Sequence, residues 1–176
     1  MTTETFVYKI GDQRRPSNGR LARLFLSLNR LPLIRNLGFV KWGILKSFKL
    51  PKSTTLNKDF YCSAPNITVG ENVSLADVYM LAYAPITIGK NSGFSFRNIL
   101  ITSTHDINNF STVIAKPIII GDNVWITTNV TILPGVTIGD GSIIGAGSVV
   151  TGDIPAHVFA AGNPCRVIKK INFTMR

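Results

Sequence analysis

The chain has 176 residues, enough for a single domain, and 45% of them are apolar, so it can bury a sizeable core. Charged residues make up only 16%, which excludes an intrinsically disordered segment. No apolar run reaches about 18 residues, and the polar N-terminus lacks the apolar stretch of a secretory signal, so neither a membrane-spanning helix nor secretion is expected. Two distant cysteines, Cys62 and Cys165, indicate neither a disulfide framework nor a zinc site and fit a cytoplasmic protein.

Residues 1–60 form a basic N-terminal segment that we expect to be helical. They contain 12 of the 19 Lys and Arg residues and three acidic ones, a net charge of +9, whereas residues 61–176 carry 7 − 6 = +1. Apolar residues at helical spacing predict one helix from Arg20 to Leu31, ended by Pro32, and a second from Leu33 to about Ser47. Two roles are open: the helices cover the end of the following domain, or they lie on an anionic membrane face. No readout motif accompanies the charge, so nucleic acid is not expected as a partner.

Residues 61–170 carry a repeat with a period of six, in which a large apolar residue is usually followed by a small one. One extra residue precedes Ile88, and the apolar positions are Val69, Leu75, Leu81, Ile88, Phe94, Leu100 and, after an interruption, Ile120, Ile126, Ile132, Ile138, Ile144 and Val150. A period of six excludes a helix, whose period is 3.6, and a β-sandwich holds no such fixed repeat. The repeat predicts short strands joined by tight corners, three to each turn of a parallel β-helix.

An insertion of 14 residues interrupts the repeat between Leu100 and Ile120. The resulting loop, residues 101–117, contains His105, one of two His residues in the chain, and a long loop in a compact repeat is usually functional. Neutral imidazole can take the proton of a hydroxyl group, so His105 is a candidate general base. We expect Asp106 and His157 to have structural roles, and residues 171–176 to form a C-terminal tail.

Three repeat segments and the His105 loop resemble the hexapeptide-repeat acyltransferases; they are Ile119–Ile126, Ile132–Thr151, Ala161–Ile168 and Ser103–Asp106. Within that family, the chain is most similar to the galactoside, maltose and polysaccharide O-acetyltransferases. The resemblance implies a left-handed coil, a homotrimer, and acetyl-CoA bound between neighbouring subunits. It implies direct transfer of the acetyl group to a carbohydrate hydroxyl, without a metal, on a surface polysaccharide or its lipid-linked precursor.

The resemblance also assigns roles to individual residues. His105 is the general base, and a backbone N–H near Thr128 is a donor to the oxyanion. Asp77 and Trp125 are expected to flank the acceptor and the thioester. The coenzyme is expected to contact small residues along its pantetheine arm and cations at its 3′-phosphate: Ala146, Gly147, Thr151, Arg166 and Lys169. Gly152 stands where many relatives have Lys, so one phosphate contact is expected to be missing.

Two other functions are open from the sequence. One is an N-acetyltransferase of an amino sugar or an antibiotic, because such proteins share the repeat. The other is a structural or assembly module, in which His105 is dispensable. A carbonic anhydrase on the same coil is not expected, because it needs three His ligands and the chain has two His residues.

Overall fold

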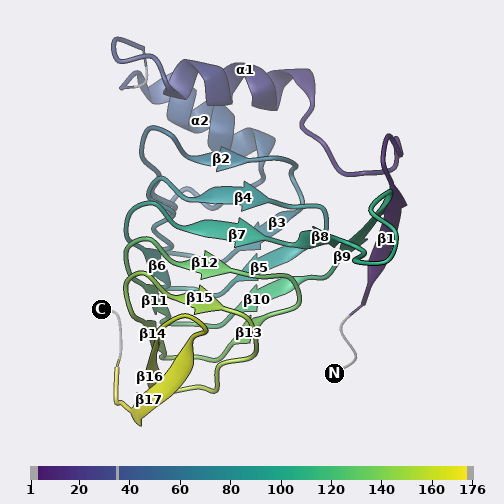
Figure 1. Cartoon of the computed structure of the whole chain (residues 1–176). Helices are drawn as coiled ribbons and strands as arrows, with labels where there is room; N and C mark the ends of the chain where they lie inside the picture. Colours follow the sequence, from purple (N-terminus) through teal and green to yellow (C-terminus); the bar gives the residue numbers. More distant parts are fainter. Residues whose placement is uncertain (1–3, 35, 174–176) are drawn as a thin grey trace.

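In the computed structural model, which describes residues 4–34 and 36–173, the chain winds into a three-sided coil of stacked parallel strands (Figure 1). The first face holds β3 (Ile67–Val69), β5 (Ile86–Ile88), β10 (Ile118–Ile120) and β13 (Thr137–Ile138). The second holds β6 (Gly93–Phe94), β11 (Trp125–Ile126), β14 (Ile143–Ile144), β16 (Val158–Ala161) and the antiparallel β17 (Arg166–Lys170). The third holds β2 (Tyr61–Cys62), β4 (Tyr79–Leu81), β7 (Ile99–Ile101), β12 (Thr131–Ile132) and β15 (Val149–Val150).

The six-residue repeat places one large apolar side chain from each strand inside the coil. Residues 18 positions apart stack in register, as Ile126 does on Ile144 and Ile132 on Val150. All six apolar positions from Ile120 to Val150 are at most 1% exposed. Burying a side chain of this size contributes roughly 1.5–3 kcal/mol, so the column of stacked residues is the main source of stability in the coil.

The prediction for Leu81 was wrong. Met80, which pairs with Leu100, is the buried residue of β4, whereas Leu81 is half-buried. The chain takes five residues from Leu75 to Met80 and eight from Met80 to Ile88, so one short and one long corner together add the single extra residue. A period read from apolar residues alone does not locate such paired irregularities, because Leu81 and Met80 are both apolar.

Aspartate side chains tie one turn of the coil to the next at the corner between the first and second faces. The carboxylate of Asp122 accepts a hydrogen bond from the Lys90 N–H at 2.9 Å, and that of Asp140 accepts one from the Asp122 N–H at 2.8 Å. At Gly121 a Cβ atom would lie only 2.9 Å from the Asp140 nitrogen, which explains the small residue that follows Ile120. The repeat therefore specifies the corners as well as the core.

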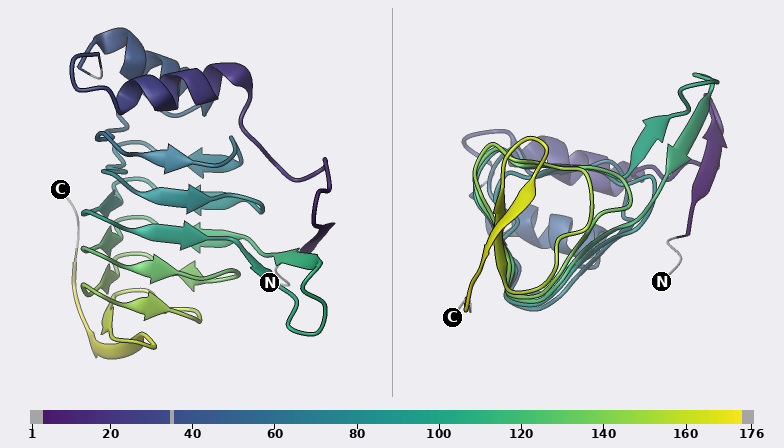
Figure 2. Two further views of the ribbon diagram at one scale, coloured as in Figure 1. Left: turned by 45° about the horizontal axis from the view of Figure 1, so that its top comes forward. Right: turned by 60° about the horizontal axis from the view of Figure 1, so that its bottom comes forward.

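Two helices cover the N-terminal end of the coil, in agreement with the first of the two predicted roles (Figures 1 and 2). They are α1 (Arg20–Asn29) and α2 (Gly38–Ser47). Val40 and Ile44 of α2 are fully buried, and the buried Phe48 ring meets Phe60 edge-on at 6.1 Å. Both helices are shorter than predicted, because turns occupy residues 30–34 and Leu37 precedes α2.

The insertion forms a hairpin that projects from the coil, which we call the arm. Its strands are β8 (Ser103–His105) and β9 (Thr112–Ala115), and β9 pairs on its other edge with β1 (Phe6–Lys9). Figure 2 shows this small antiparallel sheet standing out from one corner of the triangular coil. The N-terminal segment was expected to be helical, so a strand at its start that pairs with the insertion is an addition to the prediction.

Candidate active site

His105 lies on the arm, exposed, with its imidazole fixed by Phe110. The Nδ1 atom is 2.7 Å from the Phe110 carbonyl oxygen, and the two rings stack at 4.1 Å with an angle of 10°. A carbonyl can only accept a hydrogen bond, so in the neutral imidazole the proton is on Nδ1 and the lone pair is on Nε2. This arrangement leaves Nε2 as the ring atom that can accept a proton.

The rest of the arm holds this geometry in place. Asp106 does not orient His105, as expected, because its carboxylate accepts the Asn108 N–H at 2.8 Å within the hairpin turn. The β1 strand borders β9 over four residues, and the Tyr8 hydroxyl donates to the Tyr83 carbonyl at 3.1 Å. The β1 strand therefore fastens the arm to the coil.

A cleft of about 370 Å³ lies at the same corner, between the coil, α1 and the segment that joins β1 to α1. We call it the arm cleft; the residues that matter below are Asn18, Arg23, Arg30, Tyr61, Ser63 and Tyr83. Burial, with a smaller contribution from Tyr79, raises the pKa of Tyr61, so its hydroxyl stays protonated and can donate a hydrogen bond. The cleft adjoins the fastening of the arm, because Tyr83 lines it and also accepts the Tyr8 bond.

Thr128, Ala146 and Gly147 stack at a different corner, where the chain passes from the second face to the third. The Gly147 N–H donates to the Thr128 carbonyl at 3.0 Å. The N–H groups on either side of Thr128 are used within the coil, whereas no hydrogen bond of its own N–H is found among residues 4–34 and 36–173. Gly147 has φ of +72° and nothing within 4 Å of a Cβ position, so this corner offers an open surface and an available backbone donor.

Trp125, the second substrate-site candidate, and the remaining coenzyme candidates are spread over neighbouring surfaces. Trp125 is 38% exposed on the second face, where its Nε1 donates to Ser95 at 3.2 Å and its ring stacks on Phe173. Arg166 and Lys169 are exposed on β17, at the edge of that face. Thr151 lies one corner further on than Ala146, after β15, so a single chain does not gather all five coenzyme candidates.

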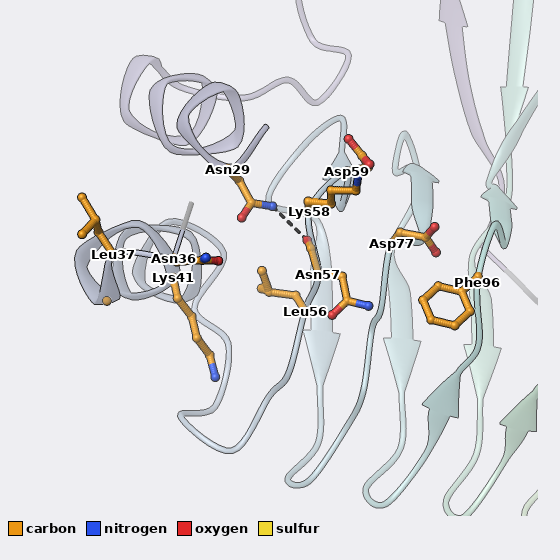
Figure 3. A pocket seen from close by; sticks show the side chains of 11 residues that line it. Asn29, Asn36, Leu37, Lys41, Leu56, Asn57, Lys58, Asp59, Asp77 and Phe96 are labelled. Atoms are coloured by element: carbon orange, nitrogen blue, oxygen red, sulfur yellow. Dashed lines mark hydrogen bonds between the residues drawn. The ribbon is translucent and has the colours of Figure 1, made fainter. Parts of the chain in front are cut away.

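Asp77 lies at the same corner as Thr128, nearer the helices. Its Oδ1 accepts the Arg97 N–H at 2.8 Å, a corner bond of the kind made by the repeat aspartates. It also lines a second cleft of about 540 Å³, with Asn57 and Phe96 on successive turns and Lys41 from α2 (Figure 3). The Asp77 carboxylate thus makes a structural hydrogen bond and also borders a cleft.

One chain therefore places the candidate base and the candidate oxyanion donor at two separate corners. The His105 arm and the arm cleft share one corner, and Thr128, Ala146, Gly147 and Asp77 share another. Sequence reasoning missed Phe110, Tyr8 and the arm cleft, because nothing in the repeat indicates which distant segment pairs with the insertion. The one available signal was Phe110 itself, an exposed aromatic residue inside the loop that carries the histidine.

Neither thiol is suited to serve as a nucleophile. Burial raises the pKa of Cys62 to about 12, and its thiol donates to the Ala64 carbonyl. Burial also raises the pKa of Cys165. Within the described residues no three His, Cys, Asp or Glu side chains form a group that could hold a metal ion, and no helix is long and apolar enough to span a bilayer.

Residues 117–152 match the family model of the bacterial transferase hexapeptide, six repeats. A putative acetyltransferase of Dictyostelium discoideum is 47% identical over 111 residues, which are 60% of this chain and 58% of that protein. The match thus spans less than two thirds of that relative.

Two solved structures are similar over most of their length. A maltose O-acetyltransferase of Clostridium difficile 630 has a TM-score of 0.82 and 34% identity, with 94% of this chain and 92% of that chain covered. A galactoside acetyltransferase in complex with coenzyme A has a TM-score of 0.67 and 32% identity, with 86% and 79% covered. These similarities confirm the predicted coil of six-residue repeats, a left-handed β-helix.

Proposed function

Because the chain belongs to the hexapeptide-repeat acyltransferase family, we propose that it is an acetyl-CoA-dependent O-acetyltransferase that acts on a carbohydrate hydroxyl. The observation that carries the proposal is the His105 imidazole, held through Nδ1 by the Phe110 carbonyl so that Nε2 has the lone pair. Coenzyme A is bound in the galactoside acetyltransferase structure, and this supports acetyl-CoA as the donor.

The proposed reaction is a direct transfer. Nε2 of His105 takes the proton of the acceptor hydroxyl while its oxygen attacks the thioester carbonyl carbon. The N–H of Thr128 donates to the carbonyl oxygen as it becomes negative. The C–S bond then breaks, the coenzyme thiolate receives the proton from the imidazolium, and the products are the acetyl ester and coenzyme A. No acyl-enzyme forms, in keeping with the two buried thiols.

We propose further that each active site is shared between two copies in a homotrimer. His105 lies at a different corner of the chain from the stacked residues Thr128, Ala146 and Gly147, which we call the Thr128 column. A neighbouring copy can bring its Thr128 column to the arm. Apolar side chains on the outer faces, such as Ile99 and Ile119, are 37% and 36% exposed in the single chain, and contact with neighbours would bury them. In this assembly Asp77 of one copy approaches the acceptor held by the other, and Trp125 flanks the reacting thioester. The coenzyme is contacted by Ala146, Gly147, Thr151, Arg166 and Lys169.

We also propose that the helical cap attaches reversibly to an anionic membrane surface on the cytoplasmic side, where a polysaccharide precursor would be the acceptor. The support is composition and exposure. Residues 13–58 contain 11 basic and no acidic residues, and Leu21, Leu33 and Trp42 are 66%, 92% and 58% exposed on or beside the two helices. Interleaved basic and apolar side chains are typical of segments that lie at such a surface.

The proposed function is tested by incubating the purified full chain with acetyl-CoA and a panel of neutral, anionic and amino sugars. We expect release of the coenzyme thiol that depends on the sugar, and a product that is heavier by one acetyl group. Cleavage of that product by mild alkali identifies an ester, whereas a stable amide would favour the N-acetyltransferase alternative. Coenzyme binding without acetylation of any sugar would contradict the proposal and favour a structural module.

A further inference from the structure

The arm cleft is surrounded by guanidinium groups that have no carboxylate partner. Arg23 and Arg30 line it, and no acidic residue does. Arg15, beside the cleft, lies 5.6 Å above the ring of Tyr83. The ion pairs found within residues 4–34 and 36–173 are Arg14 with Asp12 and Lys90 with Asp122, so these three arginines are not neutralised by the part of the chain described here.

Aromatic rings form the wall against which these cations lie. The guanidinium carbon of Arg30 is 5.9 Å from the centre of the Tyr61 ring. Tyr61 in turn stacks on Tyr79 at 4.8 Å and 17°, so its ring is held in one orientation. Rigid aromatic side chains with a few polar groups are the usual walls of a small-molecule site.

Asn18 ties the segment that joins β1 to α1 to the coil at the base of the cleft. It is 6% exposed, and its Nδ2 donates to the Cys62 carbonyl at 2.5 Å. Its Oδ1 receives no hydrogen bond from the described residues, and it is buried with almost no accessible surface, so it offers no contact to a molecule in the cleft.

From the unpaired arginines and the aromatic wall we propose that the arm cleft binds an acceptor sugar that carries a negative charge, a carboxylate or a phosphate, with Arg23 and Arg30 as the anion-binding residues. The inference rests on the proposed acetyltransferase function and narrows its substrate class. Arg30 and Arg23 bind the anion, and the sugar lies beside the Tyr61, Ser63 and Tyr83 side chains that line the cleft. The cleft adjoins the Tyr83 fastening of the His105 arm, and the proposal requires a sugar anchored there to present a further hydroxyl to Nε2.

The test compares matched acceptors that differ only at C6. Methyl galactoside, methyl galactosiduronate and methyl galactoside 6-phosphate share the ring and the anomeric methyl group, and the last two separate a carboxylate from a phosphate. We expect kcat/KM for at least one anionic sugar to exceed that of the neutral sugar by about tenfold or more, the size of a charged hydrogen bond. Equal values for all three would overturn the inference while leaving the acetyltransferase proposal intact.

Variants locate the effect in the cleft. Arg30→Gln should reduce the anionic-to-neutral ratio about tenfold, and Arg30→Lys, which keeps the charge, should restore part of it. Arg14→Gln is the matched control, because it removes the same charge from the same segment where Asp12 already pairs with it. Arg23→Gln is the substitute if Arg30→Gln does not fold. A control that lowers the ratio as much as Arg30→Gln would overturn the assignment.

Calorimetry without acetyl-CoA measures the cleft even if no transfer occurs. The anionic sugar should bind, and Arg30→Gln should weaken that binding about tenfold. If Arg30→Gln instead weakens binding of coenzyme A and leaves the sugar unaffected, the cleft belongs to the donor phosphates and the inference is wrong. Absence of acetylation together with arginine-dependent sugar binding would remove the enzymatic proposal but keep the anion site.

Discussion

The coil between residues 118 and 150 and the arm that carries His105 are held together in different ways. In the coil, each inward residue stacks on the equivalent residue 18 positions away and is almost fully buried. In the arm, Ile107 and Phe110 are 98% and 72% exposed, and the strands that meet, β1 and β9, are about a hundred residues apart in the sequence. The repeat supplies stability, and the irregular insertion carries His105, the proposed general base.

This contrast predicts that the largest effect on activity comes from the arm. His105→Ala should lower kcat by roughly 10²–10⁴, the usual contribution of a general base, with no loss of folded structure. Coenzyme A affinity, measured by calorimetry, should hardly change, because the imidazole serves the acceptor. His157→Ala is the control, since the other histidine lies in a turn beyond β15. An equal loss of coenzyme binding in His105→Ala would show that the residue is structural.

The coil should show the opposite response. Ile132→Ala removes a fully buried side chain and should lower the free energy of unfolding by about 2–5 kcal/mol, while activity per folded molecule stays the same. Ile107→Ala, in the arm, should change stability by less than about 0.5 kcal/mol. Denaturant unfolding measures both. Similar losses for the two variants would mean that the arm shares the core of the coil.

Removal of residues 2–10 tests whether β1 positions the arm without contributing to the stability of the coil. The deletion takes away β1 and the Tyr8 bond to Tyr83, so the arm should lose its fixed position. We expect kcat to fall roughly 10- to 100-fold, because small misplacements of a catalytic group are costly. The melting temperature of the coil should shift little. Unchanged kinetics would show that the hairpin alone positions His105.

The smallest predicted effect concerns the cap and the membrane. Each Lys or Arg near an anionic surface contributes about 1 kcal/mol, falling off within a Debye length, so a few kcal/mol is the ceiling. The full chain should sediment with anionic vesicles at low salt and dissociate as salt is added. Lys46→Glu with Lys49→Glu should weaken this, whereas Lys169→Glu with Lys170→Glu, at the opposite end of the coil, should not. Equal sedimentation with neutral vesicles would leave the helices as a cap alone.

Much of the coil could be predicted because its information is local. Each apolar residue at positions 120, 126 and 132 indicates one strand, the corner that follows it and the face on which it lies. The 14-residue insertion stands out against that period. The failure at Leu81 shows the limit: where two adjacent residues are both apolar, only the packing decides which one faces inward.

The arm and the cap could be predicted only in outline, because non-local contacts decide their geometry. His105 could be found as a lone histidine in a long loop. Its stacking on Phe110 and the pairing of β1 with β9 depend on contacts that no spacing encodes. The helical pattern in residues 20–47 was strong enough to predict two helices. The first helix ends earlier, at Asn29, and the second begins later, at Gly38, than the pattern indicated.

The central claim is that each active site combines the arm of one copy with the Thr128 column of another. Mixing two inactive variants tests it most directly. His105→Ala removes the base, and Gly147→Asp places a carboxylate on the open coenzyme surface while keeping a residue that tolerates positive φ. Random reassembly of equal amounts into trimers should restore about one quarter of wild-type activity, because 1/2 × 1/2 of the interfaces combine an intact arm with an intact column. Light scattering should give three times the 19.2 kDa chain mass for the reassembled sample. A reassembled trimer with no more activity than either variant alone would show that each chain builds its own site.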